Sequence, residues 1–205
     1  MKKELIIFDM DGTLVDSSLT IAYAINYVRE KLGLLPLEPN FILEKVNDHT
    51  INPAKFFYEV DEFEKIHEEW FSEYYTQNHK RELLLYDGIK ELLEALDQKG
   101  IRLAVATNAY RASTIQSLTH LGIYSLFDTI ACHDDVPQGK PYPDMLYKIL
   151  DELDISAKDS LFIGDGERDE IASQKANIEY IMVNWGFSEY KDAIFSVEEL
   201  KSRLI

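Results

Sequence analysis

Residues 5–13 read Leu-Ile-Ile-Phe-Asp-Met-Asp-Gly-Thr and change from apolar to polar after Phe8. A short, continuous apolar run of this kind is typical of a parallel strand that is buried on both faces. The acidic residues and the glycine that follow it are typical of a loop. The sequence therefore predicts a buried strand that ends at two carboxylates, Asp9 and Asp11.

The same change of character recurs along the chain, which indicates a sheet of several strands. Four further apolar runs end at or just before polar residues; they are 103–106, 129–131, 161–163 and 180–183. Segments with apolar residues at helical spacing lie between the runs, at 89–96, 115–121 and 146–153. Strands that alternate with helices predict an α/β fold, namely a Rossmann-like parallel sheet core with helices on both faces. Ligands of such sheets bind outside the carboxyl ends of the strands, where the polar residues fall.

Residues 17–83 interrupt this alternation. They show only helical patterning, and three prolines divide them into shorter segments: Pro36, Pro39 and Pro53. An insertion of this length after the first strand predicts a separate, helical lobe. We therefore expect two domains, one formed by 1–16 and 84–205 and the other by 17–83.

The composition is that of a globular protein and limits the choice of function. Of the 205 residues, 46% are hydrophobic and 28% are charged, and the formal net charge is −16. A surface this acidic repels nucleic acid and anionic lipid, so neither nucleic acid nor membrane is expected as a partner. No apolar stretch approaches the roughly 20 residues that span a bilayer, and no signal-peptide core follows Met1, which predicts a cytoplasmic protein. The single cysteine, Cys132, has no partner for an internal disulfide.

A second acidic loop, Gly-Asp-Gly-Glu-Arg-Asp at residues 164–169, follows a different predicted strand. Taken alone, each acidic loop is equally consistent with a turn or a helix start. The carboxyl ends of parallel strands meet at one edge of the sheet, so the two loops are expected to lie together there. Their carboxylates are Asp9, Asp11, Asp165 and Asp169. Carboxylates that close require protonation or a cation, and magnesium with a substrate phosphate fits such an oxygen-rich site, which points to phosphoryl chemistry.

Two further residues fit that chemistry. Thr107 ends a predicted strand and can offer its hydroxyl and the following backbone N–H groups to a phosphoryl oxygen, although a helix N-cap explains it equally well in isolation. Lys140 lies in Gln-Gly-Lys-Pro-Tyr-Pro, a loop stiffened by two prolines. Lysines in loops are usually solvated, but an ammonium group fixed beside the carboxylates would supply the positive charge that an anionic substrate needs.

These motifs, in this order, resemble those of the haloacid dehalogenase-like hydrolase superfamily. The matching residues are Asp9-Met10-Asp11-Gly12-Thr13, Thr107-Asn108, Lys140-Pro141, and Gly164-Asp165 with Asp169. The resemblance spans the whole predicted core, and the insertion at 17–83 is similar to the helical cap of the family. Three further segments resemble its phosphoglycolate phosphatase-like subfamily: Asp16-Ser17, Tyr86-Asp87-Gly88 and Trp185-Gly186-Phe187. One departure is Gly166, where many members carry serine or threonine.

The resemblance implies a magnesium-dependent phosphatase that forms an aspartyl-phosphate intermediate. By analogy with the family, Asp9 would attack phosphorus, and Asp11 would protonate the leaving alcohol and later accept a proton from the attacking water. Magnesium would be held by an Asp9 oxygen, the Asp11 backbone carbonyl and Asp165. Asp169 would act through a bound water or by positioning Lys140. The transferring group would be clamped by Thr107, Asn108 and Lys140.

The cap is implied to set substrate specificity, and a polar loop predicted at 45–55 is the part most suited to this role. Its candidate substrate-binding residues are Lys45, His49, Asn52 and Lys55. We expect one or more of them to contact an anionic or hydroxylated substrate as the loop closes over the leaving group and expels water. Each of them taken singly is also explained as a solvated loop residue.

Several activities remain open within and beyond this family. Asp11 argues against a dehalogenase, which needs no acid at that position, and a phosphomutase is disfavoured because residues 16–23 contain no histidine. A pyrophosphatase or nucleotidase fits as well as a phosphoglycolate or sugar phosphatase. Outside the family, a receiver-like signalling domain carries similar residues but is shorter, and a noncatalytic binding module would leave the full set of motifs unexplained. A small-molecule phosphate ester is therefore the expected partner of a monomer or homodimer.

Overall fold

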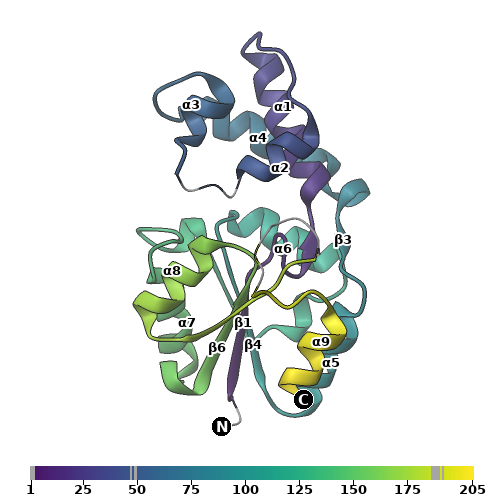
Figure 1. Ribbon diagram of the computed structural model, residues 1–205, viewed down its shortest axis with the longest axis vertical. Coiled ribbons are helices and arrows are strands. Elements are labelled where there is room, and N and C mark those ends of the chain that lie inside the picture. The colour runs from purple at the N-terminus through teal and green to yellow at the C-terminus, as the bar shows by residue number, and fades with distance from the viewer. Residues whose placement is uncertain (1–2, 47, 49, 186–189, 191) are drawn as a thin grey trace. The chain divides into compact units, whose positions relative to one another are not determined.

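The structure, a computed structural model, describes residues 3–46, 48, 50–185, 190 and 192–205. The chain divides into two compact units (Figure 1). The core unit comprises Met1–Asp16 and Leu84–Ile205, and the helical unit comprises Ser17–Leu83. Of the helices in the described residues, none is both long and apolar enough to cross a membrane.

The core unit is built on a five-stranded parallel sheet with the strand order β5-β4-β1-β6-β7. Its strands are β1 (Leu5–Phe8), β4 (Arg102–Thr107), β5 (Thr129–Cys132), β6 (Ser160–Gly164) and β7 (Glu179–Met182). They fall on the five apolar runs, so the prediction of a Rossmann-like parallel sheet is confirmed. β1 is central, and its last residue, Phe8, pairs with Val105 of β4 and Ile163 of β6. The residues that follow these three strands therefore emerge at one edge of the sheet.

Helices cover both faces of this sheet (Figure 1). They are α5 (Ile89–Gln98), α6 (Arg111–His120), α7 (Asp144–Leu153), α8 (Glu167–Ala176) and α9 (Val197–Leu204), with short 3₁₀ helices η1 (Tyr124–Leu126), η2 (His133–Asp135) and η3 (Ala157–Asp159). On one face, Ile7 and Phe162 of the sheet belong to the same packed core as Ile149 of α7 and Ala172 of α8. On the other face, α5 contacts β4 and buries three leucines at helical spacing: Leu92, Leu93 and Leu96.

A second, two-stranded sheet marks the place where the helical unit is inserted. β2 (Val15–Asp16) and β3 (Leu84–Leu85) pair in antiparallel fashion, with Val15 opposite Leu85 and Asp16 opposite Leu84. The chain leaves the core unit after β2 and returns at β3. The two connections are therefore hydrogen-bonded to each other within the core unit.

The helical unit contains α1 (Ser18–Lys31), α2 (Pro39–Val46), α3 (Pro53–Tyr58) and α4 (Lys65–Glu82). Its core is apolar and partly aromatic: Ala22, Ile25, Val28, Ile42, Phe57 and Tyr58. Arg29 is buried, and its guanidinium donates hydrogen bonds to the backbone carbonyls of Leu35 and Phe57. The buried charge thereby ties the segment after α1 to the end of α3.

The prediction of a polar loop over 45–55 is wrong at both ends. α2 continues through Lys45 to Val46, and α3 begins at Pro53. Asn52 is the N-cap of α3, and its side chain accepts a hydrogen bond from the Lys55 N–H at 3.1 Å. Asparagine at the N-cap followed by proline at the first helical position favours a helix start, and this local signal outweighs the polar composition of the segment.

Candidate active site

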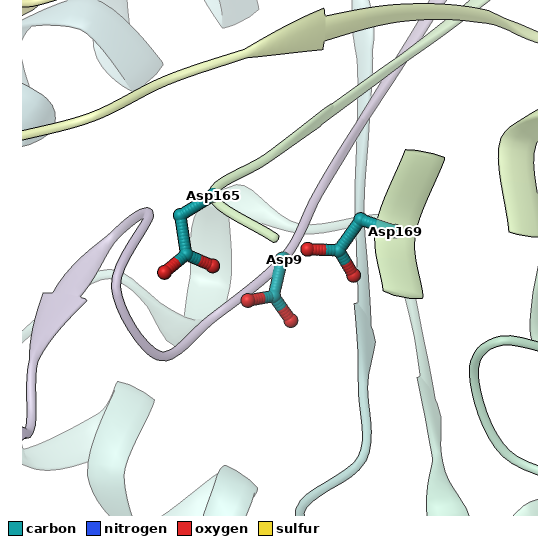
Figure 2. A group of neighbouring side chains, drawn as sticks. All are labelled: Asp9, Asp165 and Asp169. Carbon is teal, nitrogen blue, oxygen red and sulfur yellow. The ribbon is translucent and has the colours of Figure 1, made fainter. Parts of the chain in front are cut away.

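Three carboxylates converge at the edge of the sheet where β1 and β6 end. Asp9 follows β1, Asp165 follows β6, and Asp169 lies in the first turn of α8. Each offers a carboxylate oxygen that lies within 4.8 Å of the other two. Figure 2 shows the carboxylate of Asp9 between those of Asp165 and Asp169. This group, called the acidic cluster below, has the hard oxygen donors that divalent cations prefer.

The fourth predicted carboxylate, Asp11, lies outside the acidic cluster. After Asp9 the chain turns tightly, and the N–H groups of Leu14 and Val15 both donate to the Met10 carbonyl. Asp11 lies on this turn, and its charge adds to the rise in the pKa of Asp9. The structure thus brings three of the four predicted carboxylates together and leaves Asp11 on the adjacent turn.

Lys140 is buried against the acidic cluster, with 6% of its surface exposed. Its Nζ donates to Asp9 Oδ1 at 2.5 Å and to the Ala106 carbonyl at 2.9 Å, and it lies 2.6 Å from Asp169 Oδ1. The same nitrogen lies 5.5 Å from the centre of the Phe162 ring. An ammonium group has three donors, and these three oxygens can accept all of them. The charge of Lys140 is therefore fixed at one point of the site.

Burial and the charges of neighbouring groups together set the pKa values of these residues. Burial raises the pKa of Asp9 to about 7; the charge of Lys140 opposes this rise and that of Asp169 adds to it. Burial, together with the charges of Asp9 and Asp169, also raises the pKa of Asp165 well above its usual range. For Lys140, burial favours the neutral amine, but the charges of Asp169 and Asp9 outweigh it and raise the pKa. Full ionisation of the three carboxylates would leave two negative charges unbalanced by the one ammonium, and no cation of the described residues pairs with Asp165.

Two glycines allow the carboxylates to approach so closely. Gly12 has a φ of +83°, and a Cβ added there would lie 2.6 Å from Asp165 Cγ. A Cβ added at Gly164 would lie 2.7 Å from the Cβ of Asp169. Both distances are too short for a real contact, so a side chain at either position would displace a carboxylate of the acidic cluster.

Thr107 ends β4, and Asn108 follows it. Thr107 is buried, and its hydroxyl accepts a hydrogen bond from the Ala109 N–H at 3.1 Å. The N-cap of α6 is Tyr110, so the interpretation of Thr107 as a helix N-cap is wrong, and its hydroxyl instead closes a turn before the helix. Asn108 pairs with the backbone of Lys140: Nδ2 donates to the carbonyl at 3.0 Å, and Oδ1 accepts the N–H at 2.8 Å. Lys140 thus contacts three other predicted site residues directly: Asp9, Asp169 and Asn108.

The four cap residues predicted to bind substrate belong to the helical unit, and one of them, Lys55, has its Nζ 3.0 Å from Asp61 Oδ1. Lys45 lies in the last turn of α2, with its Nζ 3.8 Å from a carboxylate oxygen of Asp48. Asn52 caps α3 and also donates to the Asp61 carbonyl at 3.1 Å. His49 lies outside the described residues. Lys45 and Asn52 are each engaged with a neighbour in their own unit.

The sequence profile of the family described as haloacid dehalogenase-like hydrolase matches residues 6–183. This range includes the whole acidic cluster, Lys140 and the helical unit. The chain belongs to this family. The hydrolase is 31% identical over 204 residues to a phosphoglycolate phosphatase from Colwellia psychrerythraea, a match that covers 93% of this chain and 88% of the relative. It is also 27% identical over 191 residues to the pyrophosphatase PpaX of Oceanobacillus iheyensis, a match that covers 90% of this chain and 85% of the relative.

A solved structure resembles this hydrolase over nearly its full length. The crystal structure of a predicted phosphoglycolate phosphatase from Haemophilus somnus has a TM-score of 0.79 and 28% identity, and the match covers 96% of this chain and 89% of that one. The predicted resemblance to the phosphoglycolate phosphatase-like subfamily is therefore confirmed. Membership of this family excludes the receiver-like signalling domain.

Sequence reasoning missed parts of the hydrolase site that carry little signal. The Ala106 carbonyl holds Lys140, but a main-chain group has no signature in the sequence. Phe162 lies near the Lys140 ammonium, yet in the sequence it looks like any other core residue of a strand. Gly12 and Gly164 did carry a signal, because each is next to an aspartate of the motifs. A glycine in that position indicates close packing around the carboxylates as well as a turn.

Proposed function

We propose that this hydrolase is a magnesium-dependent phosphatase that acts on small phosphorylated metabolites through an aspartyl-phosphate intermediate. The observation that carries the proposal is the acidic cluster with the ammonium of Lys140 buried against it. A cation bound there would neutralise the carboxylates, and the ammonium would stabilise the oxygens of the transferring group. The relatives named phosphoglycolate phosphatase and pyrophosphatase support this chemistry.

Asp9 is the proposed nucleophile. Lys140 holds its Oδ1, which leaves Oδ2 to attack phosphorus. In the first step the bond from Oδ2 to phosphorus forms, the bond from phosphorus to the leaving oxygen breaks, and Asp11 gives that oxygen a proton. In the second step Asp11 takes a proton from water, whose oxygen attacks phosphorus and releases inorganic phosphate and the free carboxylate of Asp9.

The residues of the acidic cluster fit a magnesium ion. Their donors are hard oxygens, three carboxylates share a single ammonium, and Asp165 has no cation partner among the described residues. Asp9, Asp165 and the backbone carbonyl of Asp11 would hold the ion, and Asp169 would hold Lys140. When bound, the ion would offset negative charge on the carboxylates and on the transferring phosphoryl oxygens.

Thr107 and Lys140 would hold the transferring phosphoryl group on the side of β4. The Thr107 hydroxyl accepts from the Ala109 N–H, so its own proton remains available for donation to a phosphoryl oxygen. The Lys140 ammonium pairs with Asp9, where phosphorus would be attacked. Preorganised donors of this kind stabilise the charge that develops on the oxygens.

The helical unit would supply substrate specificity. The names of the relatives give two substrates to begin with, phosphoglycolate and pyrophosphate. Four residues remain proposed contacts for an anionic or hydroxylated substrate: Lys45, His49, Asn52 and Lys55. An alanine variant that leaves the order of preference over a panel of phosphate esters unchanged would remove that residue from the proposal.

We also propose that the enzyme works in the cytoplasm as a monomer or a homodimer. Its net charge of −16 disfavours nucleic acid and anionic membranes as partners. Fractionation of cells that express the chain and sedimentation of the purified protein would test the location and the oligomeric state.

Phosphate release by the purified protein tests the proposed function. The panel contains p-nitrophenyl phosphate, phosphoglycolate, sugar phosphates, nucleotides and pyrophosphate, assayed after EDTA treatment and again after magnesium is restored. We expect activity only with magnesium, and a loss of roughly 10,000-fold or more in Asp9→Asn, which keeps the shape of the side chain. The matched control is Asp154→Asn, because Asp154 is exposed and asparagine tolerates its left-handed conformation. Hydrolysis at the wild-type rate in Asp9→Asn would rule out Asp9 as the nucleophile.

A further inference from the structure

Asn108 makes two hydrogen bonds to the backbone of a single residue. Its Nδ2 donates to the Lys140 carbonyl at 3.0 Å, and its Oδ1 accepts the Lys140 N–H at 2.8 Å. The two residues are 32 positions apart in the chain. A carboxamide that satisfies both backbone groups of one residue fixes that residue's main chain. The side chain thereby joins the end of β4 to the loop that carries Lys140.

The loop before Lys140 packs tightly against this amide. A Cβ added at Gly139 would lie 2.6 Å from Asn108 Oδ1 and 2.7 Å from His133 Nδ1. Since Oδ1 is enclosed by Gly139 and bonded to Lys140, one N–H of Nδ2 is the donor left for any other partner. Asn108 is therefore better placed to hold Lys140 than to bind a substrate.

A second contact holds the same loop from α8. Lys175 Nζ donates to the Pro141 carbonyl at 2.9 Å and lies 4.6 Å from the centre of the Tyr142 ring. The first turn of α8 also carries Asp169, which pairs with the Lys140 ammonium. One helix thus holds both the ammonium of Lys140 and the main chain that follows it.

We propose that Asn108 and Lys175 are positioning residues of the phosphatase reaction, which clamp the backbone at Lys140 and after it so that its ammonium meets Asp9 and the transferring phosphoryl group. This role rests on the proposed function, in which Lys140 stabilises the transferring oxygens. It replaces the expectation that Asn108 binds substrate. Neither side chain touches the reacting atoms; both act through Lys140.

The two residues differ in exposure and therefore in expected effect. Asn108 is partly buried, and its loss would leave both backbone groups of Lys140 without a partner. A catalytic group displaced by about 1 Å can cost roughly 100-fold in rate, so we expect Asn108→Ala to lower kcat about 10- to 100-fold. Lys175 is exposed, where single contacts contribute little, and Lys175→Met is expected to lower kcat about two- to fivefold.

Double-mutant cycles assayed with p-nitrophenyl phosphate and phosphoglycolate test this role. The variants are N108A, K175M, K140M and the two double variants with K140M. The matched control is K148M, because Lys148 pairs with Glu152 on the surface of α7, and it is expected to keep the wild-type kcat. We expect N108A to lower kcat by the same factor for both substrates with KM within about twofold of wild type. Neither N108A nor K175M should have a further effect once Lys140 is replaced.

Two kinetic outcomes, besides an unchanged kcat in N108A, would overturn the role of Asn108. A rise in KM that differs between the substrates would place Asn108 against the leaving group, and a loss that persists beside K140M would show that it acts independently of Lys140. If N108A does not fold, N108D serves instead, because its second carboxylate oxygen would face the Lys140 carbonyl and should also lower kcat. A wild-type enzyme that hydrolyses no ester contradicts the proposed function, whereas an active wild type with an equally active N108A overturns the clamp alone.

Discussion

The ion pairs of Lys140 and Lys55 have similar geometry and opposite surroundings. In the core unit, Lys140 Nζ lies 2.6 Å from Asp169, and the two side chains are 4% and 5% exposed. In the helical unit, Lys55 Nζ lies 3.0 Å from Asp61, and the side chains are 63% and 92% exposed. Water screens the second pair, whereas the first depends on the protein groups around it.

The two units therefore differ in what their charges require. The core unit encloses an ammonium and several carboxylates, and each needs a partner, such as the Ala106 carbonyl for Lys140. The helical unit buries mainly apolar and aromatic side chains and leaves most of its charges on the surface. The degree of burial, more than the distance between the charged atoms, distinguishes the ion pairs of the candidate active site from an ordinary surface ion pair. Exposed residues of the helical unit can change at little cost to the folding free energy.

Among the substitutions that test this comparison, removal of the buried ammonium is expected to have the largest effect. Lys140→Met keeps most of the side-chain length but leaves Asp9 and Asp169 without their cation. We expect kcat to fall roughly 100- to 1,000-fold, and the free energy of unfolding to fall by about 3 kcal/mol at neutral pH. Steady-state kinetics and urea unfolding measure the two effects. A variant as stable as the wild type would contradict the view that burial makes the Lys140 ion pair more important for stability than the exposed Lys55 pair.

Glycine substitutions test how closely the core unit packs around its carboxylates. Gly164→Ala would place a Cβ 2.7 Å from that of Asp169 and displace this side chain. Gly100→Ala is the matched control, because Gly100 has a φ of +72° but no atom within 4 Å of an added Cβ. We expect G164A to lower the free energy of unfolding by about 2 kcal/mol and kcat by about 10-fold. G100A should cost about 1 kcal/mol with kcat unchanged, and equal kcat values in both would show that the position of Asp169 is unimportant.

In the helical unit, a helix cap is expected to matter more than an ion pair. Asn52→Ala removes the acceptor for the Lys55 N–H and should cost about 1 kcal/mol of unfolding free energy. Asn52→Asp keeps that acceptor and should stay within about 0.5 kcal/mol of the wild type. Urea unfolding distinguishes the two variants. Equal losses would point instead to the bond from Asn52 to the Asp61 carbonyl, which aspartate cannot make.

The smallest effect is expected from the exposed ion pair. Lys55→Met removes the contact with Asp61 and should change the free energy of unfolding by no more than about 0.5 kcal/mol. Urea unfolding at low and high salt, alongside Lys140→Met, gives the direct comparison. A loss above about 1 kcal/mol would contradict the view that exposure makes this pair weak.

The apolar runs predict all five strands of the main sheet, because a strand buried on both faces reads as a continuous hydrophobic segment. The pairing of β2 with β3 has no such signal. Each of these strands has two residues, which is too short for a periodic pattern. Their pairing depends on the return of the chain after the helical unit, and this long-range closure is not visible in local spacing.

The candidate site likewise contains residues that the sequence could place and residues that it could not. Asp9, Asp165 and Lys140 could be predicted to lie together, because each follows a strand or a rigid loop at a shared sheet edge. The direction of a side chain within a turn is not contained in sequence spacing. For this reason the sequence alone places Asp11 with the other carboxylates, whereas in the structure it lies outside the acidic cluster. The two hydrogen bonds from Asn108 to the backbone of Lys140 likewise have no signal in the sequence.

The pairing of β2 with β3 also bears on how such an enzyme can diversify. Because Val15 lies opposite Leu85, the points where the chain departs and returns are neighbours, and everything between them is attached at one place. None of the five main strands comes from that segment. Exchange of the inserted segment at this junction would therefore leave the hydrogen-bond ladder of the main sheet in place, so that one core unit could be joined to different helical units.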